Sequence, residues 1–313
     1  MVEGQAGLTW ERWKTLAARV EQWGFAGLYR SDHFTNPSPP NQNSLEMIVS
    51  LTYLADHSRN IHFGPLVAPF SFRDPVMLAR QAADIDELSK GRMILGVGAG
   101  WQQREHEMFG YPLLDVAARM ERFAEGLRVV RALLKSDAPV LFAGKFYTLR
   151  DAEILPRPHK TKILVGGNGV HRTLPLAAKY ADVWNGVQLS PAQFQALAAK
   201  LDDCLRAPGR APTELKKTAA TFIFFGRSRD ALEQRVTRVR TRSEEWRNLP
   251  LEQLLAELRA RNNSITGLAD DVIPQIRAYG DAGVEELMLQ IFDSDDVDGL
   301  VAFAEHVMPH VAS

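Results

Sequence analysis

Short apolar runs alternate along the chain with longer stretches in which apolar residues recur every three or four positions. The short runs predict β-strands and the longer stretches predict amphipathic helices, with proline and glycine concentrated at the boundaries. Strands that alternate with helices are typical of parallel βα units. The predicted strands are residues 27–31, 61–68, 93–97, 162–166, 182–187, 219–225 and 286–292. The predicted helices between them are residues 45–56, 75–88, 117–135, 173–180, 191–205, 229–240 and 269–282.

A further helix is predicted ahead of the first of these strands. Thr9 is a suitable N-cap for it and Gly24 a suitable C-cap. Its apolar face is formed, at helical spacing, by Trp10, Trp13, Leu16, Ala17 and Val20. The strand at residues 27–31 therefore follows a helix, as in a βα repeat.

Met1, Val2 and Glu3 supply an eighth strand, and eight parallel strands close a (β/α)₈ barrel. The sequence thus predicts an α/β fold in which residues 1–313 form one barrel domain. Its first strand is very short, either as a true stub or because the chain starts inside the strand. Residues 140–149 alternate around a glycine and predict a β-hairpin inserted before strand five. Residues 241–264, after strand seven, predict charged helices that form a solvated face or a lid over a site.

The balance of charge argues against two classes of partner. The 313 residues include 37 basic and 38 acidic ones, which leaves no excess positive charge for nucleic acid or an anionic membrane surface. No stretch approaches the roughly 20 apolar residues of a membrane span, and no basic and apolar leader opens the chain. The single cysteine, Cys204, has no intramolecular disulfide partner and indicates a reducing compartment. We therefore expect a cytoplasmic protein.

Asp32 and His33 stand directly after the predicted strand at residues 27–31. In parallel α/β folds, the loops that follow the carboxyl ends of the strands carry the catalytic residues. A histidine has an ordinary pKa of about 6.5, so it exchanges a proton near neutral pH. The alternative is a histidine that is satisfied by its neighbours and has no chemical role.

A glycine-rich turn, Gly166, Gly167, Asn168 and Gly169, joins the predicted strand at residues 162–166 to the helix at residues 173–180. Glycines let backbone N–H groups approach a phosphate closely, and the following helix adds the positive end of its dipole. The alternative is that the glycines serve only the geometry of the turn. The turn lacks the Lys-Ser/Thr pair of a nucleotide-binding loop and the later acidic residue of a dinucleotide-binding fingerprint.

The predicted strand at residues 93–97 runs into Gly98, Ala99, Gly100 and Trp101. Small residues at a strand end leave room for a flat ligand, on which Trp101 would stack, so Gly98, Gly100 and Trp101 are candidate cofactor-binding residues. In the alternative, the glycines relieve crowding inside the barrel and Trp101 packs under a loop. Candidate aromatic walls of an apolar substrate pocket are Phe34, Phe70, Trp101, Trp184 and Phe225.

Taken in order, these motifs resemble the luciferase-like monooxygenase superfamily, and within it the branch of oxidoreductases that use the deazaflavin coenzyme F420. The resemblance is carried by SDHF (31–34), FRDP (72–75), LSKGRMILGVGAGW (88–101), VGGNG (165–169), ADVWN (181–185) and AGVEEL (282–287). Six blocks in the same order are far more specific than any one of them. They extend from the second strand almost to the C-terminus.

The resemblance implies a (β/α)₈ barrel, a homodimer and a flavin-like ring that lies across the carboxyl ends of the strands. It places His33 next to the reactive carbon of the ring. It implies a non-proline cis peptide bond within residues 66–69, expected at Val67-Ala68. This bond would support one face of the ring. It places the phosphate of the cofactor on the turn from Gly166 to Gly169.

One departure from the resemblance concerns the substrate. In the sugar-phosphate dehydrogenases of this family an acidic residue follows the Gly-x-Gly of strand four, whereas this chain has Trp101. The departure argues against a sugar phosphate and leaves the proton donor open. Glu105 and Glu107 follow, but their polar neighbours predict an exposed helical segment, so neither receives a role.

The resemblance therefore implies hydride transfer between coenzyme F420 and a small organic substrate, in which His33 passes a proton and Asp32 orients the imidazole or caps the loop. One alternative is a monooxygenase that uses O₂ and reduced flavin mononucleotide (FMN) from a partner reductase. Another is a protein that binds flavin without turnover. A metal-dependent hydrolase would ligate a metal through Asp32 and His33, but strands four to six end in Gly, Asn and Gln, so no metal is expected.

Overall fold

The computed structural model describes residues 1–158, 161–207, 209–240, 244–291 and 296–311. The chain divides into two compact units, each described here by itself. The larger unit comprises Val2–Trp184 and Lys200–Lys216, and the smaller unit comprises Met1, Asn185–Ala199 and Lys217–Ser313. The strand β8 (Val183–Val187) and the helix α7 (Pro191–Arg206) are divided between them.

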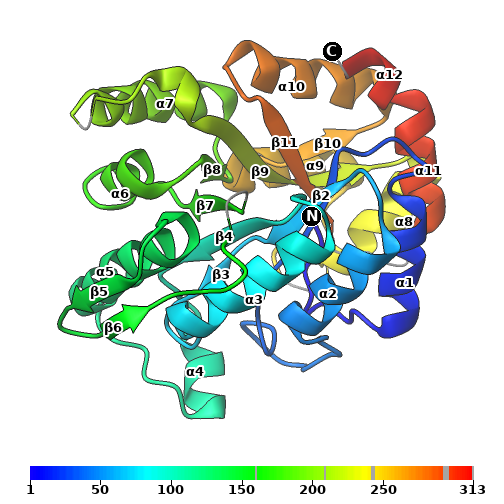
Figure 1. Ribbon diagram of the computed structural model, residues 1–313. Helices are drawn as coiled ribbons and strands as arrows, with labels where there is room; N and C mark the ends of the chain where they lie inside the picture. Colours follow the sequence, from blue (N-terminus) through cyan, green and yellow to red (C-terminus); the bar gives the residue numbers. More distant parts are fainter. Residues whose placement is uncertain (159–160, 208, 241–243, 292–295, 312–313) are drawn as a thin grey trace. The chain divides into compact units, whose positions relative to one another are not determined.

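Parallel strands form the centre of the larger unit (Figure 1). β1 (Gly27–Arg30) pairs with β2 (His62–Pro65), with Gly27 opposite His62. β4 (Ile94–Gly98) pairs on one side with β3 (Ala68–Pro69) and on the other with β7 (Lys162–Gly166). All of these pairs are parallel, so the carboxyl ends of their strands lie at one edge, as the βα pattern predicted.

The helices of the larger unit follow the strands in alternation. They are α1 (Trp10–Arg19), α2 (Met47–His57), α3 (Pro75–Leu88), α4 (Gln103–Phe109), α5 (Val116–Lys135) and α6 (Thr173–Tyr180), with a 3₁₀ turn at Pro212–Glu214. α3 begins where predicted because the Asp74 carboxylate accepts the N–H groups of Val76 and Met77, and Pro75 fits the first helical position. α2 and α3 lie side by side (Figure 1).

The first helix differs from its prediction in one residue of its apolar face. Thr9 is its N-cap, as predicted, and Trp13 and Leu16 are buried. Trp10 is instead 39% exposed. The regular helix ends at Arg19 and passes into a turn in which the N–H of Gly24 donates to the carbonyl of Glu21 and the N–H of Phe25 donates to the carbonyl of Val20, both at 3.1 Å. These are the bonds of a Schellman C-cap, so the predicted role of Gly24 as the capping glycine is confirmed. Gly24, at φ 80°, belongs to the turn that follows.

The predicted first strand is reduced to a single parallel bridge between Val2 and Arg30. The N–H of Val2 donates to the carbonyl of Tyr29 at 2.9 Å, and the N–H of Ser31 donates to the carbonyl of Val2 at 3.0 Å. The start of the chain therefore pairs with the edge of β1, although only over one residue. That residues 1–313 form one barrel domain remains a prediction.

The predicted hairpin is confirmed. β5 (Val140–Ala143) and β6 (Thr148–Ala152) pair in antiparallel fashion and stand next to α5 (Figure 1). The Glu125 carboxylate of α5 accepts three N–H groups of the connecting turn, those of Lys145, Phe146 and Tyr147, at 2.7–3.0 Å. A helix side chain thus supplies the acceptors that the turn lacks.

The smaller unit has its own parallel strands. β9 (Lys216–Phe225) pairs with β10 (Ile265–Gly267) and with β11 (Glu286–Gln290). β10 was not predicted, because three residues are too few to set up a period. The predicted strand at residues 286–292 ends earlier, and its last residue lies outside the described residues. The helices are α8 (Arg229–Arg240), α9 (Leu251–Asn262), α10 (Ala269–Asp281), α11 (Val297–His306) and α12 (Met308–Val311).

The charged insertion is only partly a solvated face. In α9 the side chains of Leu251, Leu254, Leu255 and Leu258 are buried and pack in one cluster with apolar residues of α8. The charged residues of α9, such as Glu252 and Arg261, lie on the exposed side. The described part of the insertion is thus amphipathic, and a lid role for it remains a prediction.

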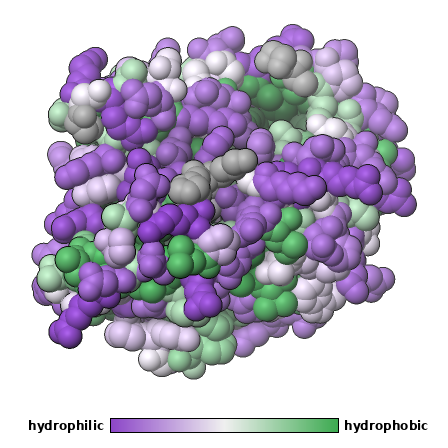
Figure 2. Space-filling model, in the orientation of Figure 1, coloured by the Kyte–Doolittle hydropathy of each residue, from purple (hydrophilic) through white to green (hydrophobic). Residues whose placement is uncertain are grey.

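No helix within the described residues has the length and apolar character needed to cross a bilayer. The face of the molecule drawn in Figure 2 is mostly hydrophilic, and hydrophobic side chains appear on it in small separate patches.

Candidate active site

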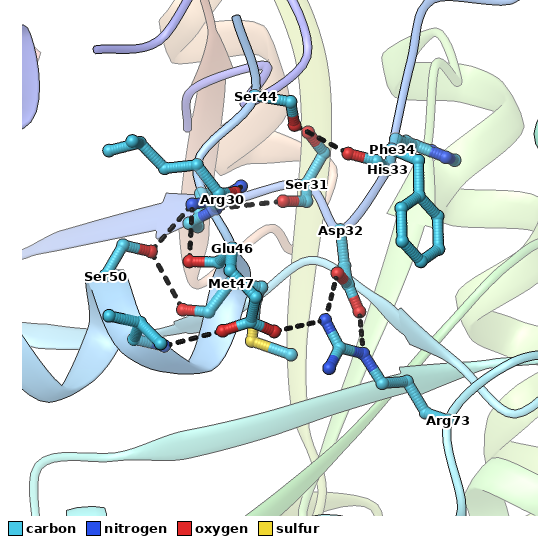
Figure 3. Close-up of polar contacts among 12 residues, drawn as sticks. Arg30, Ser31, Asp32, His33, Phe34, Ser44, Glu46, Met47, Ser50 and Arg73 are labelled. Atoms are coloured by element: carbon cyan, nitrogen blue, oxygen red, sulfur yellow. Dashed lines mark hydrogen bonds and ion pairs between the residues drawn. The ribbon is translucent and has the colours of Figure 1, made fainter. Parts of the chain in front are cut away.

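The loop after β1 is held in place by hydrogen bonds on both sides. Ser31 Oγ accepts the N–H of Gly4 at 2.8 Å and donates to Gln5 Oε1 at 2.6 Å. Ser44 Oγ donates to the carbonyl oxygen of His33 at 2.7 Å (Figure 3). Asp32 and His33 therefore sit on a fixed loop at the carboxyl end of a parallel strand.

Asp32 forms an ion pair with Arg73 (Figure 3). Arg73 Nε and Nη2 donate to Asp32 Oδ2 and Oδ1 at 2.9 and 2.8 Å, and Nη2 also donates to Glu46 Oε1 at 2.7 Å. Burial lowers the pKa of Arg73, but the hydrogen bonds and charges of Asp32 and Glu46 outweigh it and raise that pKa above its ordinary value. Both oxygens of Asp32 are thus engaged by Arg73, and the imidazole of His33 is oriented by a different residue.

That residue is Glu105 of α4. Its Oε1 lies 2.9 Å from His33 Nδ1, and its Oε2 accepts the N–H of Phe34 at 3.0 Å. The Glu105 side chain is 1% exposed and the His33 side chain 15% exposed. Burial lowers the pKa of His33, but the hydrogen bond and the charge of Glu105 together outweigh it, so the net pKa lies above its ordinary value.

The prediction of an exposed helical segment after Trp101 is right about the helix and wrong about the exposure of three of its residues. The helix is present, but Gln102, Glu105 and His106 are buried, at 2%, 1% and 1% exposure. Gln102 Nε2 donates to the carbonyl of Thr35 at 2.7 Å, so α4 packs on the loop that carries His33. Positions 102, 105 and 106 share one helical face, but residues 102–107 are all polar, so the sequence carries no signal of which face is buried.

Trp101 stands beside His33. The two rings meet edge to face, with centroids 5.7 Å apart and planes inclined by 79°. Trp101 is 60% exposed, so it is not packed under a loop. Gly100 precedes it at φ 85°, where an added Cβ would also lie 2.0 Å from Ser71 Oγ. The exposed indole therefore borders the partly exposed imidazole.

The expected cis peptide bond is present, one bond earlier than predicted. It joins Leu66 to Val67, whereas Val67-Ala68 was expected. Val67 is half-buried among glycines, because a Cβ on Gly96, Gly98 or Gly166 would lie 3.3, 2.6 or 3.0 Å from its methyl groups. Gly98 thus makes room for Val67, as in the alternative that the glycines relieve crowding. The side chain at these strand ends that remains half-buried is that of Val67.

Ala68, also predicted to touch the cofactor, is fully buried and pairs with Val97 of β4. Its side chain is therefore packed in the core, and Leu66 and Val67 before it are half-buried.

The turn after β7 is open at the start of α6. Gly166, Gly167 and Asn168 are half-buried, and Gly169 is exposed. Gly167 has φ 126°, and Trp184 Nε1 donates to its carbonyl at 2.9 Å. The N-cap residue of α6 makes no side-chain cap hydrogen bond. In the first turn of α6 the N–H of Leu174 donates to the carbonyl of Gly169 at 3.0 Å and Pro175 has no N–H, so the backbone of the glycine-rich turn, rather than the helix start, is what fits a phosphate.

The predicted aromatic walls divide into core and surface. Phe70, Trp184 and Phe225 are buried at 0–1% exposure and belong to the cores of their units. Phe34 is 37% exposed and stacks on Phe109 with centroids 4.4 Å apart. Phe72 and Tyr111 pack against Phe34 as well, at 5.0 and 5.8 Å.

Within the described part of the chain, no three His, Cys, Asp or Glu side chains come together as a set of metal ligands. Asp32 and His33 are engaged by Arg73 and Glu105 instead.

Comparison with known proteins identifies the family of the chain. A family model described as luciferase-like monooxygenase matches residues 2–289. The chain belongs to that family. Its alternation of parallel strands and helices is accordingly the (β/α)₈ barrel fold of luciferase-like proteins, as the sequence predicted. Membership also makes this luciferase-like protein an oxidoreductase of the flavin- or deazaflavin-dependent class.

Two curated relatives represent the two chemistries of the family. An F420-dependent glucose-6-phosphate dehydrogenase from Amycolatopsis mediterranei (strain U-32) is 27% identical, over 94% of this chain and 92% of the relative. A 4-hydroxyprotoasukamycin monooxygenase from Streptomyces nodosus subsp. asukaensis is 28% identical, over 97% and 87%. Among solved structures, an F420-dependent secondary alcohol dehydrogenase in complex with an F420-acetone adduct superposes with a TM-score of 0.81. It is 22% identical, and the superposition covers 100% of this chain and 99% of that structure's chain.

Proposed function

We propose that this luciferase-like protein transfers hydride between coenzyme F420 and a small organic substrate. The observation that carries the proposal is the His33 imidazole, partly exposed beside Trp101 at the carboxyl ends of the strands, with Nδ1 against Glu105. Reduction of a carbonyl group needs a proton as well as a hydride, and an imidazole with a raised pKa is suited to supply it near neutral pH.

The residues at the strand ends fit a flat ring with a phosphate-bearing tail. The half-buried Val67 side chain after the cis bond, together with Gly98, Gly100 and Trp101, would support the ring. The backbone of the turn from Gly166 to Gly169 would hold the phosphate. When bound, a deazaflavin gives or accepts a hydride and hardly activates oxygen.

The protein's own part in the reaction is proton transfer and orientation. In reduction, protonated His33 donates its Nε2 proton to the carbonyl oxygen while the carbonyl carbon receives the hydride, and the product is an alcohol. In oxidation, neutral His33 takes the hydroxyl proton as the carbon loses the hydride. Trp101 confines the substrate against the imidazole, and the aromatic groups nearby exclude water.

A second candidate is an FMN-dependent monooxygenase that receives reduced flavin from a partner reductase. It is favoured by the 28% identity to a monooxygenase over 97% of this chain. A flavin-binding protein without turnover is the remaining alternative.

Three further properties belong to the proposal. We propose a homodimer, which light scattering tests by its mass, and one barrel domain formed by residues 1–313. We also propose a cytoplasmic location, in keeping with the single Cys204.

The decisive experiment titrates the purified apo-protein with F420 and, in parallel, with FMN, and follows cofactor fluorescence. Tight binding of F420 alone supports the proposal, and reduced F420 is then assayed with ketones and aldehydes. Tight binding of FMN alone supports the monooxygenase. Binding of neither overturns both. His33→Ala should lose turnover and keep cofactor binding, and a fully active variant would contradict the role of His33.

A further inference from the structure

We infer that Glu105 is the positioning residue for His33: it holds the imidazole with Nδ1–H toward its carboxylate and leaves Nε2 for the substrate. The inference deepens the proposed function and rests on it for the reaction, although the pairing itself is tested without any cofactor.

The contact joins two elements far apart in the sequence. His33 Nδ1 and Glu105 Oε1 are 2.9 Å apart, and the second carboxylate oxygen accepts the N–H of the next residue, Phe34, at 3.0 Å. Two consecutive residues of the catalytic loop are thus tied to one carboxylate. A carboxylate only accepts hydrogen bonds, so Nδ1 carries the proton in this contact.

Glu105 is 1% exposed and does not reach solvent. A group this buried acts through its neighbour, which makes Glu105 a positioning residue and His33 the catalytic one. The burial also makes the contact strong, because a charge-assisted hydrogen bond gains strength where water is excluded.

The start of α4 holds the Glu105 backbone in place. Gln102 Nε2 donates to the carbonyl of Thr35 at 2.7 Å, and Arg104 Nη1 donates to the carbonyl of Asn36 at 2.7 Å. His106 Nδ1 lies 2.7 Å from the carbonyl of Gln102. Glu105 therefore comes from a helix that is docked on the loop it serves, with little freedom to release the imidazole.

The other charged groups around His33 do not take this role. Asp32, on the same loop, gives both oxygens to Arg73. Glu3, from the N-terminal segment, acts on His33 through its charge. Burial lowers the pKa of His33, and the direct hydrogen bond and charge of Glu105 raise it most, followed by Glu3 and Asp32. Loss of Glu105 therefore removes the largest stabilisation of the imidazolium.

A purely structural role would also explain the contact, since Glu105 fastens α4 to the loop. The two roles differ in what Glu105→Gln changes. The glutamine keeps an acceptor for the N–H of Phe34 and removes the charge. A structural role predicts an unchanged pH profile, and a positioning role predicts a changed one.

The test measures the ¹⁵N chemical shifts of the His33 ring against pH in the wild type, in Glu105→Gln and in a control, Glu107→Gln. Glu107 is on the same helix and is exposed. In the wild type we expect the Nδ1–H tautomer above the His33 pKa. In Glu105→Gln we expect a lower His33 pKa, and in Glu107→Gln no change. A wild-type Nε2–H tautomer, or an unmoved pKa in Glu105→Gln, would overturn the inference.

Turnover gives the second readout. With the cofactor that the titration identifies, Glu105→Gln should lower kcat about tenfold or more and shift the pH profile, while KM and cofactor affinity change little. An unchanged kcat and profile would overturn the role. If the variant fails to fold, the wild-type tautomer alone decides. If F420 does not bind in the titration, the proposed function is overturned, but the tautomer assigned to the His33 imidazole is unaffected. A failure of the proposed function can therefore be told apart from a failure of this inference.

Discussion

Arg73 holds Asp32 by both of its oxygens, at 2.9 and 2.8 Å, across 41 positions of sequence. The pair lies at the base of the loop that carries His33, with Asp32 6% exposed and Arg73 22% exposed (Figure 3). The carboxylate next to His33 is thus committed to holding the loop, and the imidazole contacts Glu105 instead.

Replacement of Arg73 should therefore destabilise the fold. Arg73→Met leaves the Asp32 carboxylate buried without its cation, and loss of about 3 kcal/mol in the free energy of unfolding is expected. Urea denaturation measures it. Asp32→Asn in the same chain should recover part of the loss, because the stranded charge is then absent. A single variant as stable as the wild type would contradict this account.

The raised pKa of His33 predicts a pH dependence of stability. Because the folded pKa lies above the unfolded value of about 6.5, His33 contributes stability that is fully present below that value and is lost as pH rises through the folded pKa. The difference in unfolding free energy between the wild type and His33→Gln should therefore shrink from about pH 6 to about pH 9. Urea denaturation across that range checks it, and a difference that grows with pH would refute the sign.

Gly98→Ala should disturb Val67. The new Cβ would lie 2.6 Å from a Val67 methyl carbon, and overpacking of this kind costs about 1–3 kcal/mol. Gly166→Ala, at 3.0 Å, should cost less. Gly280→Ala in α10 meets nothing within 4 Å and serves as the control, which should lose no stability and gain some because alanine favours a helix. Addition of Val67→Ala to Gly98→Ala should restore stability in urea, and a failure to do so would argue against the crowding.

Glu125→Ala should loosen the hairpin formed by β5 and β6. Three turn N–H groups lose their acceptor, and a loss of about 2–3 kcal/mol is expected, with faster hydrogen exchange at Lys145, Phe146 and Tyr147. Glu121→Ala is the matched control on the same helix, because its ion pair with Lys145 is exposed. Equal effects of the two variants would contradict the proposed role of Glu125.

Trp101→Ala should leave stability nearly unchanged, because the side chain is 60% exposed. If Trp101 confines the substrate as proposed, KM should rise by about twofold to tenfold, since aromatic contacts of this kind contribute about 0.5–1.5 kcal/mol. Thermal unfolding and steady-state kinetics measure the two effects. An unchanged KM would remove Trp101 from the substrate site.

The residue pattern was sufficient for elements whose signals are local. α3 and α8 begin and end at the predicted residues, as do α6 and β7. In α3 the reason is visible, since Asp74 and Pro75 set its start within two residues of chain. β10 escaped prediction because three residues carry too little periodicity.

The sequence by itself determined the alternation of strands and helices, the family and the position of His33 at a strand end, because each follows from neighbouring residues or from ordered motifs. Only the tertiary structure decided which carboxylate contacts the imidazole of His33. Glu105 lies 72 positions from His33 and Arg73 lies 41 from Asp32. Contacts over such separations depend on how α4 and the start of α3 dock on the loop, and no local pattern of residues encodes that choice.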